Sequence, residues 1–171
     1  SRRQRQMCIR DRYATAETGS LDIDFESNNL GDTYPMTKGD VATVVSDPVN
    51  SDNKVLSIGS SETLANQSEP IFTFKMPEGK TLGDCKNLVL DIYVVNNNGM
   101  FGQGLRMKIN DKEGTVSTNF SGLGAKNNAW GKDLSVNLSM VPLTEEDKKL
   151  TEFTLSFGNR TGTGHYLYDN I

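Results

Sequence analysis

The segment from residue 88 to residue 95 constrains the fold of this chain more than any other part of the sequence. Side chains of a β-strand point alternately to the two faces of a sheet. One face of this segment is wholly apolar, and the other combines an aspartate and a tyrosine with two valines. The two sets are Leu88, Leu90, Ile92 and Val94, and Val89, Asp91, Tyr93 and Val95. The alternation predicts a strand with one side packed against a core.

Similar short segments recur along the chain, separated by Gly, Asn, Asp, Ser and Thr. This spacing of strands and turn residues is typical of an all-β sandwich or barrel. No apolar run approaches the roughly 20 residues that a membrane span needs, and no repeat or low-complexity segment divides the chain. We expect one domain with strands near 21–26, 41–46, 54–58, 70–76, 87–95, 104–110, 114–119, 130–138, 151–158 and 165–171.

Alternation also predicts which side chains form the core. Three further strands present apolar sets, which are Phe72, Phe74 and Met76; Leu105, Met107 and Ile109; and Phe153, Leu155 and Phe157. Two such inner faces packed about 10 Å apart would make a sandwich. Trp130 has the parity of Leu134 and Val136, which predicts a core or core-rim position. If the strands are neighbours, the outward set forms one polar face: Asp91, Tyr93, Arg106, Lys108, Thr154 and Ser156.

One short helix is expected near residues 144–149. Thr144 is followed three residues later by Asp147, the pattern of a helix N-terminus. Acidic residues in the first turn and Lys148 and Lys149 in the last turn complement the helix dipole.

The first twelve residues are expected to lie outside the fold. Residues 2–11, RRQRQMCIRD, resemble the translation of a transposase sequencing adapter, and we take the domain as residues 13–171. The first twelve residues hold five of the 18 basic and one of the 22 acidic residues, which leaves 13 against 21 and a net charge of −8. Nucleic acid is then an unsuitable partner, since phosphate binding needs a basic face. Cys85 is left as the lone cysteine and is expected to serve packing.

Several phrases resemble the sandwich modules of family 10 endo-1,4-β-xylanases of Bacteroidetes, which are related to family 4 and 22 carbohydrate-binding modules. They are DFESNNLGDTYPMT (24–37), ATVVSDP (42–48), NKVLSI (53–58), MPEGKTLGDCKNLVLDIYVVN (76–96), LTEEDKKLTEFTLSFG (143–158) and YLYDNI (166–171). The resemblance implies a jelly-roll sandwich of two antiparallel sheets. It also implies that the chain is truncated at its C-terminus, because the last strand continues in the family.

Sugar rings present apolar faces and many hydroxyls, so a binding site needs aromatic platforms beside hydrogen-bonding side chains. Tyr93, Arg106 and Asp91 meet this need on the outward face, and Tyr34 and Asn66 lie in loops that would form its rim. The alternative is an ordinary strand tyrosine beside a solvated arginine.

The resemblance also implies a structural calcium ion where the first and last strands meet. Glu26 and Asp169 match the positions of its ligands, and Asp24 shares the face of Glu26. Calcium takes about 6–8 oxygen ligands, so two or three carboxylates are a starting point. The alternative is a set of ordinary strand-end acids.

The leading hypothesis is a non-catalytic module of a secreted, periplasmic or cell-surface bacterial xylanase. It would bind xylan or a related β-glycan and hold the catalytic domain of the same chain near its polymer. The second hypothesis is a structural spacer with no ligand, favoured by TLANQ (63–67), where the family has an aromatic residue. A third, an autonomous glycosidase, lacks support: His165 is the single histidine, and the chain is too short for a (β/α)8 barrel of about 250 residues.

Overall fold

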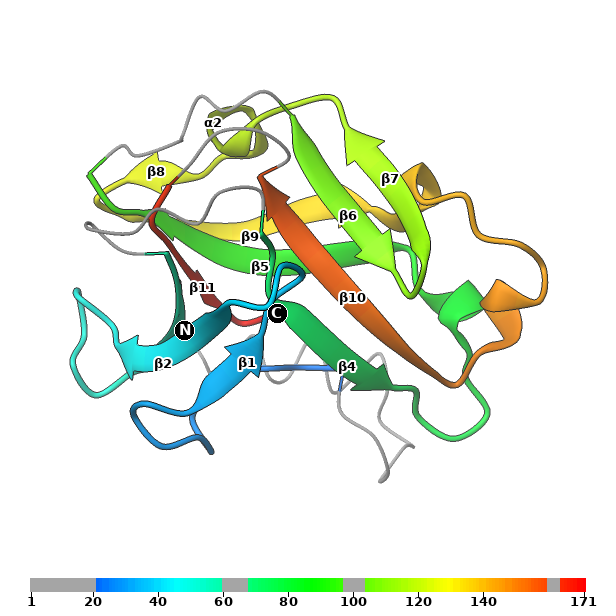
Figure 1. Cartoon of the computed structure of the whole chain (residues 1–171), viewed down its shortest axis with the longest axis horizontal. Helices are drawn as coiled ribbons and strands as arrows, with labels where there is room; N and C mark the ends of the chain where they lie inside the picture. Colours follow the sequence, from blue (N-terminus) through cyan, green and yellow to red (C-terminus); the bar gives the residue numbers. More distant parts are fainter. Residues whose placement is uncertain (1–20, 60–67, 97–103, 160–163) are drawn as a thin grey trace.

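The computed structural model describes residues 21–59, 68–96, 104–159 and 164–171, which form a sandwich of two β-sheets (Figure 1). The larger sheet has seven strands in the order β1-β2-β3-β11-β5-β8, with β9 also paired to β5. The smaller sheet has the order β4-β10-β6-β7 and lies across the front of Figure 1. The strand pairings are antiparallel apart from a two-residue contact between β5 and β8. The predicted all-β jelly-roll sandwich of two antiparallel sheets is confirmed.

Most of the predicted strands appear within one or two residues of their expected ends. The strands are β1 (Thr33–Pro35), β2 (Val41–Ser46), β3 (Lys54–Ile58), β4 (Ile71–Lys75), β5 (Asn87–Val94), β6 (Leu105–Ile109), β7 (Lys112–Val116), β8 (Lys126–Asn127), β9 (Trp130–Asn137), β10 (Glu152–Asn159) and β11 (Tyr166–Asp169). The helical turns are η1 (Leu82–Asp84), α2 (Phe120–Leu123), η2 (Leu138–Met140) and η3 (Asp147–Lys149).

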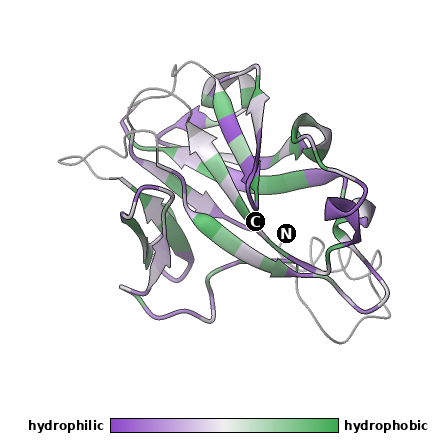
Figure 2. Ribbon diagram, turned by 45° about the vertical axis from the view of Figure 1, so that its right-hand side comes forward, coloured by the Kyte–Doolittle hydropathy of each residue, from purple (hydrophilic) through white to green (hydrophobic). Residues whose placement is uncertain are grey.

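The core lies between the two sheets and contains the apolar sets that alternation predicts. In Figure 2 the hydrophobic colour is concentrated on the strands and the hydrophilic colour on the turns. The inward set of β5 is almost fully buried: Leu88, Leu90, Ile92 and Val94. Burying one such side chain stabilises a fold by about 1.5–3 kcal/mol. The aromatic residues of β4 and β10 join the same cluster, among them Phe72, Phe74, Phe153 and Phe157.

The predicted first strand, residues 21–26, is not a strand in the structure. Ile23 exchanges two backbone hydrogen bonds with Ile171, at 2.8 and 3.0 Å. The pairing stops there because Phe25 adopts a positive φ of 59°, which turns the chain out of extended geometry. Two short strands that were not predicted, β1 and β8, extend the larger sheet.

The strand predicted at 114–119 begins earlier and ends earlier. A two-residue turn with Asn110 at φ 50° joins β6 to β7, so pairing resumes at Lys112. The strand ends before Asn119 because that side chain caps α2, accepting a hydrogen bond from the Gly122 N–H at 2.7 Å. Helix α2 was missed because four residues are too few for a periodic pattern.

The helix expected near 144–149 is a single turn, η3. Thr144 and Asp147 exchange the predicted hydrogen bonds: the Thr144 N–H donates to the Asp147 carboxylate at 2.7 Å, and the Asp147 N–H donates to Thr144 Oγ1 at 3.1 Å. The Thr144 N–H and the Thr144 hydroxyl, which donates to the same carboxylate oxygen at 2.8 Å, hold the pKa of Asp147 below its usual value. Among the described residues, no helix has the length and apolar character needed to span a membrane.

Candidate functional site

A β-bulge in β9 decides which way Trp130 faces. The pairing between β5 and β9 shifts by one residue at Asp91, where β9 places both Lys132 and Asp133 opposite a single residue. An extra residue reverses the alternation of the strand beyond it. Trp130 consequently lies opposite Tyr93 and shares its outward face. Trp130 does not share the inward face of Leu134 and Val136 that its parity predicted, although it is partly buried against a hydrophobic cluster, as a core-rim residue would be.

The sequence does contain a signal for this bulge, at Lys132. Continuous alternation from Leu134 to Trp130 would bury Lys132 in the core, where an unpaired ammonium group is costly. The bulge leaves Lys132 exposed while Leu134 stays buried. Asp133 adopts a positive φ of 55°, a conformation that aspartate tolerates better than most residues.

Gly131, next to Trp130, faces inward opposite Ile92. A Cβ atom at this position would lie 2.4 Å from the Gly124 carbonyl oxygen and 2.9 Å from Ala125 Cα. The chain just after α2 therefore fills the core side of β9 at this point. A large side chain on this side of β9 has no room, so the packing of the core reinforces the outward position of Trp130.

Trp130 and Tyr93 form the aromatic part of a cluster on the outward face of the seven-stranded sheet. Their ring centroids are 5.5 Å apart, with the planes at 63° in an edge-to-face arrangement. Val55 of β3 and Leu167 of β11 complete the buried part of this cluster. Trp130 is partly exposed, whereas Tyr93 is only 8 % exposed. We refer to Trp130, Tyr93, Val55 and Leu167 as the outer aromatic cluster.

A row of hydrogen-bonded polar side chains borders the outer aromatic cluster. The Trp130 indole N–H donates to Asp47 Oδ1 at 3.0 Å. The Asn53 amide donates to Asp47 and to Asp169, both at 3.1 Å. Asn170 continues the row by donating its side-chain N–H to Asp91 at 2.8 Å. Asp47, Asp91 and Asp169 are all buried, so these bonds offset the cost of removing three carboxylates from water.

The predicted single polar face does not exist. Asp91 and Tyr93 lie on β5 of the seven-stranded sheet, whereas Arg106 lies on β6 of the four-stranded sheet. Lys108, Thr154 and Ser156 belong to that second sheet too. The outward faces of the two sheets point to opposite sides of the sandwich. Alternation assigns a side chain to a face of its own strand, but it does not tell which sheet the strand joins.

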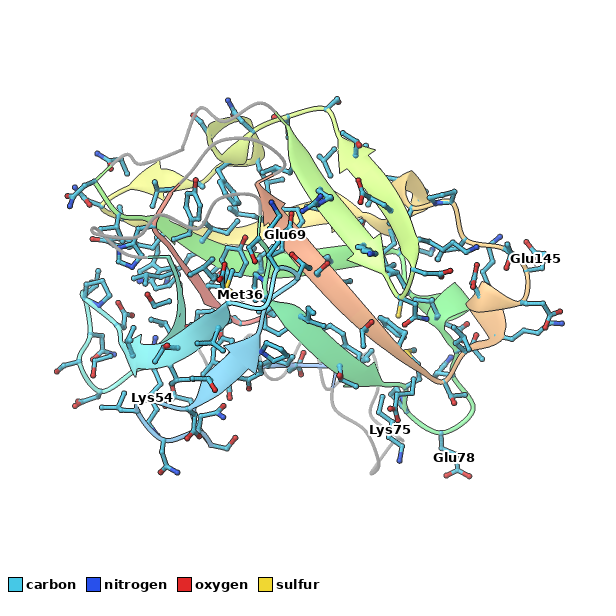
Figure 3. The ribbon with its side chains drawn as sticks, in the orientation of Figure 1. Met36, Lys54, Glu69, Lys75, Glu78 and Glu145 are labelled. Atoms are coloured by element: carbon cyan, nitrogen blue, oxygen red, sulfur yellow. The ribbon has the colours of Figure 1, made fainter. Side chains whose placement is uncertain are left out.

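Arg106 forms an ionic clamp with Glu69, which lies beside β10 in Figure 3. Its Nε and Nη2 atoms donate to the two oxygens of the Glu69 carboxylate at 2.7 and 2.8 Å. Thr37 Oγ1 donates to the same carboxylate at 2.8 Å. The Glu69 side chain is 1 % exposed, and a Cβ atom on Gly158 would lie 2.8 Å from its Cγ atom. A bidentate buried pair of this kind fastens the segment at Glu69 to the four-stranded sheet.

The structure does not bring Tyr34 to the outer aromatic cluster. Tyr34 lies opposite Ala42, whose side chain is fully buried in the core, and its ring contacts Phe25 and Phe72 at centroid distances of 5.5 and 5.9 Å. Its hydroxyl donates to Asn28 at 3.2 Å, and burial raises the pKa of this phenol. Asn66 and the rest of TLANQ lie outside the described residues.

The residues predicted to bind calcium are engaged in other contacts. The Asp24 carboxylate accepts from the Glu26 N–H, and the Glu26 carboxylate accepts from the Lys54 N–H, both at 3.1 Å. The Lys54 ammonium group, labelled in Figure 3, donates to the carbonyl oxygens of Glu26 and Asn28. Within the described residues, no group of three or more His, Cys, Asp or Glu side chains is arranged to hold a metal ion. Calcium binding by Asp24, Glu26 and Asp169 stays a prediction.

The single histidine lies near a serine. The Ser57 Oγ and His165 Nε2 atoms are 3.0 Å apart. His165 Nδ1 is buried and has no hydrogen-bond partner among the described residues. Within this part of the chain, no carboxylate orients the ring as a catalytic triad requires. Burial also lowers the pKa of this imidazole. The pair is a packing contact on the outward face of the seven-stranded sheet.

A groove of about 510 Å³ lies between η1, η2 and the segment that leads to η3. Leu82, Leu138 and Val141 line its apolar part, and the Cys85 thiol forms part of its wall. Burial, followed by the charge of Asp84, raises the pKa of Cys85. The thiol is consequently protonated at neutral pH and is a poor nucleophile.

No protein-family model matches this chain, and no curated protein matches it. A solved structure with a similar fold is a family 28 carbohydrate-binding module specific for non-crystalline cellulose. The two chains are 16 % identical with a TM-score of 0.41, and the match covers 75 % of this chain and 77 % of that one.

Proposed function

We propose that this chain is a non-catalytic module that binds a β-1,4-linked glycan, with xylan as the leading ligand. Its binding surface is the outward face of the seven-stranded sheet at Trp130. The Trp130 indole supplies a platform for a sugar ring, and the buried Tyr93 ring packs against the indole edge to face. The polar row beside it positions the platform through Asp47.

The edge-to-face pair of Trp130 and Tyr93 is the observation that carries this proposal. A partly exposed tryptophan held by a buried tyrosine and by a hydrogen bond from its N–H to a buried carboxylate is fixed in orientation. A rigid aromatic side chain loses little conformational entropy when a ligand stacks on it. This arrangement suits the apolar face of a sugar ring.

The biological setting follows from the sequence resemblance to xylanase modules. The chain would belong to a secreted, periplasmic or cell-surface enzyme and would hold a catalytic domain of the same chain near plant polysaccharide. A module of this kind relies on a few stacking contacts and hydrogen bonds. We expect dissociation constants of about 1 µM to 1 mM, which correspond to about −8 to −4 kcal/mol.

One observation favours the second candidate, a spacer domain without a ligand. The carboxylates of the polar row accept hydrogen bonds from Asn53, Asn170 and backbone N–H groups. The surface beside Trp130 is thus internally satisfied, as a structural surface would be. The two candidates differ in whether any β-glycan binds.

Isothermal titration calorimetry of the full chain with xylohexaose and cellohexaose tests the proposal. We expect measurable binding to a β-1,4-linked oligosaccharide and an at least tenfold weaker affinity for Trp130→Ala, about 1.4 kcal/mol. Comparison of the two ligands decides between xylan and glucan, which differ in the hydroxymethyl group at C5.

Lys108→Ala is the matched control, because Lys108 lies on the outward face of the opposite sheet. It is expected to bind as the unsubstituted chain does. Absence of binding to either oligosaccharide and to soluble mixed-linkage glucan would support the spacer instead. An equal loss in both variants would contradict the placement of the site.

A further inference from the structure

Asp91 is the residue that connects the bulge of β9 to the rest of the sheet. It lies at the position where the register shifts, and its Oδ1 atom accepts a hydrogen bond from the Asp133 N–H at 2.8 Å. Its Oδ2 atom accepts from the side chain of Asn170, also at 2.8 Å. Asp91 therefore bonds to the bulged residue on one side and to the end of β11 on the other.

The position of Asp91 is unfavourable for folding stability, so its hydrogen bonds have to offset that cost. Asp91 is 3 % exposed and lies directly opposite Asp169, another buried carboxylate, on the neighbouring strand β11. Like charges opposite each other destabilise a sheet. An apolar residue would avoid this repulsion, but it would lose the acceptor for the bulge.

The two registers available to β9 differ in what they bury. Without the bulge, Lys132 and Trp130 would point into the sandwich, on the side that the chain after α2 fills next to Gly131. With the bulge, Lys132 is exposed and Trp130 joins the outer aromatic cluster. A hydrogen bond to the bulged N–H selects the second register, because that N–H has left the regular ladder.

We infer that Asp91 is a positioning residue for glycan binding: it holds the bulge that presents Trp130 on the outward face. Asp91 does not touch the sugar in this arrangement, and it acts through the backbone of Asp133. The inference rests on the proposed function of the Trp130 surface, and it names the residue that sets the geometry of that surface.

Trp130 is the one tryptophan of the chain, so its fluorescence reports its surroundings without any ligand. The experiment compares Asp91→Ala and Asp91→Asn with the unsubstituted full chain in three measurements. These are the emission maximum with acrylamide quenching, xylohexaose and cellohexaose affinity by calorimetry, and urea unfolding followed by far-UV circular dichroism. Asp84→Ala is the control, because the Asp84 carboxylate also accepts a backbone N–H, that of Thr81 at 2.9 Å, but within the exposed turn η1 and not at the bulge.

We expect Asp91→Ala to unfold cooperatively, to change the quenching constant of Trp130 by at least 1.5-fold, and to bind the glycan at least tenfold more weakly. Asp91→Asn keeps one acceptor oxygen for the Asp133 N–H, so its glycan affinity should lie within about threefold of that of the unsubstituted chain. Asp84→Ala should leave both the fluorescence and the affinity unchanged.

Unchanged fluorescence and affinity in Asp91→Ala would overturn the inference and leave the proposed function standing. If the unsubstituted chain binds no glycan, the proposed function fails, while the fluorescence still shows whether Asp91 places Trp130. If Asp91→Ala does not fold, Asp91→Asn decides: a folded variant with unaltered quenching and affinity overturns the inference. Failure of both variants to fold would assign Asp91 to stability alone, which also overturns it.

Discussion

The outward faces of the two sheets both bury carboxylates, but they neutralise them differently. On the four-stranded sheet, the Glu69 carboxylate meets the guanidinium group of Arg106 in a bidentate pair. On the seven-stranded sheet, Asp47, Asp91 and Asp169 accept hydrogen bonds from amides, backbone N–H groups and the Trp130 indole. The first arrangement fastens the segment at Glu69 to the sheet, whereas the second orients side chains at a partly exposed surface. The comparison therefore separates a face held by an ion pair from the face that is proposed to bind a glycan.

Arg106→Ala is the strongest test of the structural role assigned to the four-stranded sheet. It leaves Glu69 buried without its cationic partner, and breaking such a pair costs about 3 kcal/mol. Urea unfolding measures this loss, and glycan affinity at a temperature where the variant is folded should be unchanged. The control Lys108→Ala on the same strand should alter stability by less than about 0.5 kcal/mol. A loss of affinity in the folded Arg106→Ala variant would move the binding face to this sheet.

Gly131→Ala tests whether packing beneath β9 supports the proposed binding face. The added methyl group would meet the Gly124 carbonyl and Ala125, and such overpacking costs about 1–3 kcal/mol. Because the displaced strand carries Trp130, we expect both the unfolding midpoint and the glycan affinity to fall. Ser135→Ala, at an exposed position of the same strand, is the control and should change neither. A loss of stability with full affinity would show that Trp130 tolerates movement of β9.

The smallest expected effect is the pH dependence of stability that His165 causes on the outward face of the seven-stranded sheet. Burial lowers the pKa of His165 in the folded chain below its ordinary value of 6.5. Both states are neutral above that value, so the stability contribution is complete there. As the pH falls below 6.5, the unfolded state takes up the proton more readily and stability declines until the folded pKa is passed. His165→Gln should show a shallower loss of urea midpoint between pH 7 and pH 5. If the urea midpoints of His165→Gln and of the unsubstituted chain fall in parallel with pH, His165 does not contribute in this way.

Much of the fold is readable in the sequence. Alternation places Leu88, Leu90 and Ile92 in the core because burial of an apolar face dominates the energetics of a strand. The Thr144 and Asp147 contacts are local, and they too follow from residue spacing. Short elements such as β8 and α2 were not predicted, because they have too few residues to show a repeating pattern of apolar side chains.

The candidate site was harder to predict because it depends on pairing between distant strands. Tyr93 and Asp91 were chosen from their own strand, and Trp130 was assigned to the core by a parity that one bulged residue reverses. Arg106 was placed with them because sequence does not reveal which sheet a strand joins. Lys132 is the sequence signal for the bulge, since uninterrupted alternation would bury its charge.

The sequence by itself determined that this chain forms a β-sandwich, and it determined which face of each regular strand is apolar. These properties depend on period and composition, which act within a strand. The tertiary structure alone decided that Arg106 and Tyr93 lie on opposite sides of the molecule and that Trp130 lies outward. Both outcomes depend on strand order and register, which are set by contacts between residues far apart in the chain, such as Asp91 with Asp133 and with Asn170.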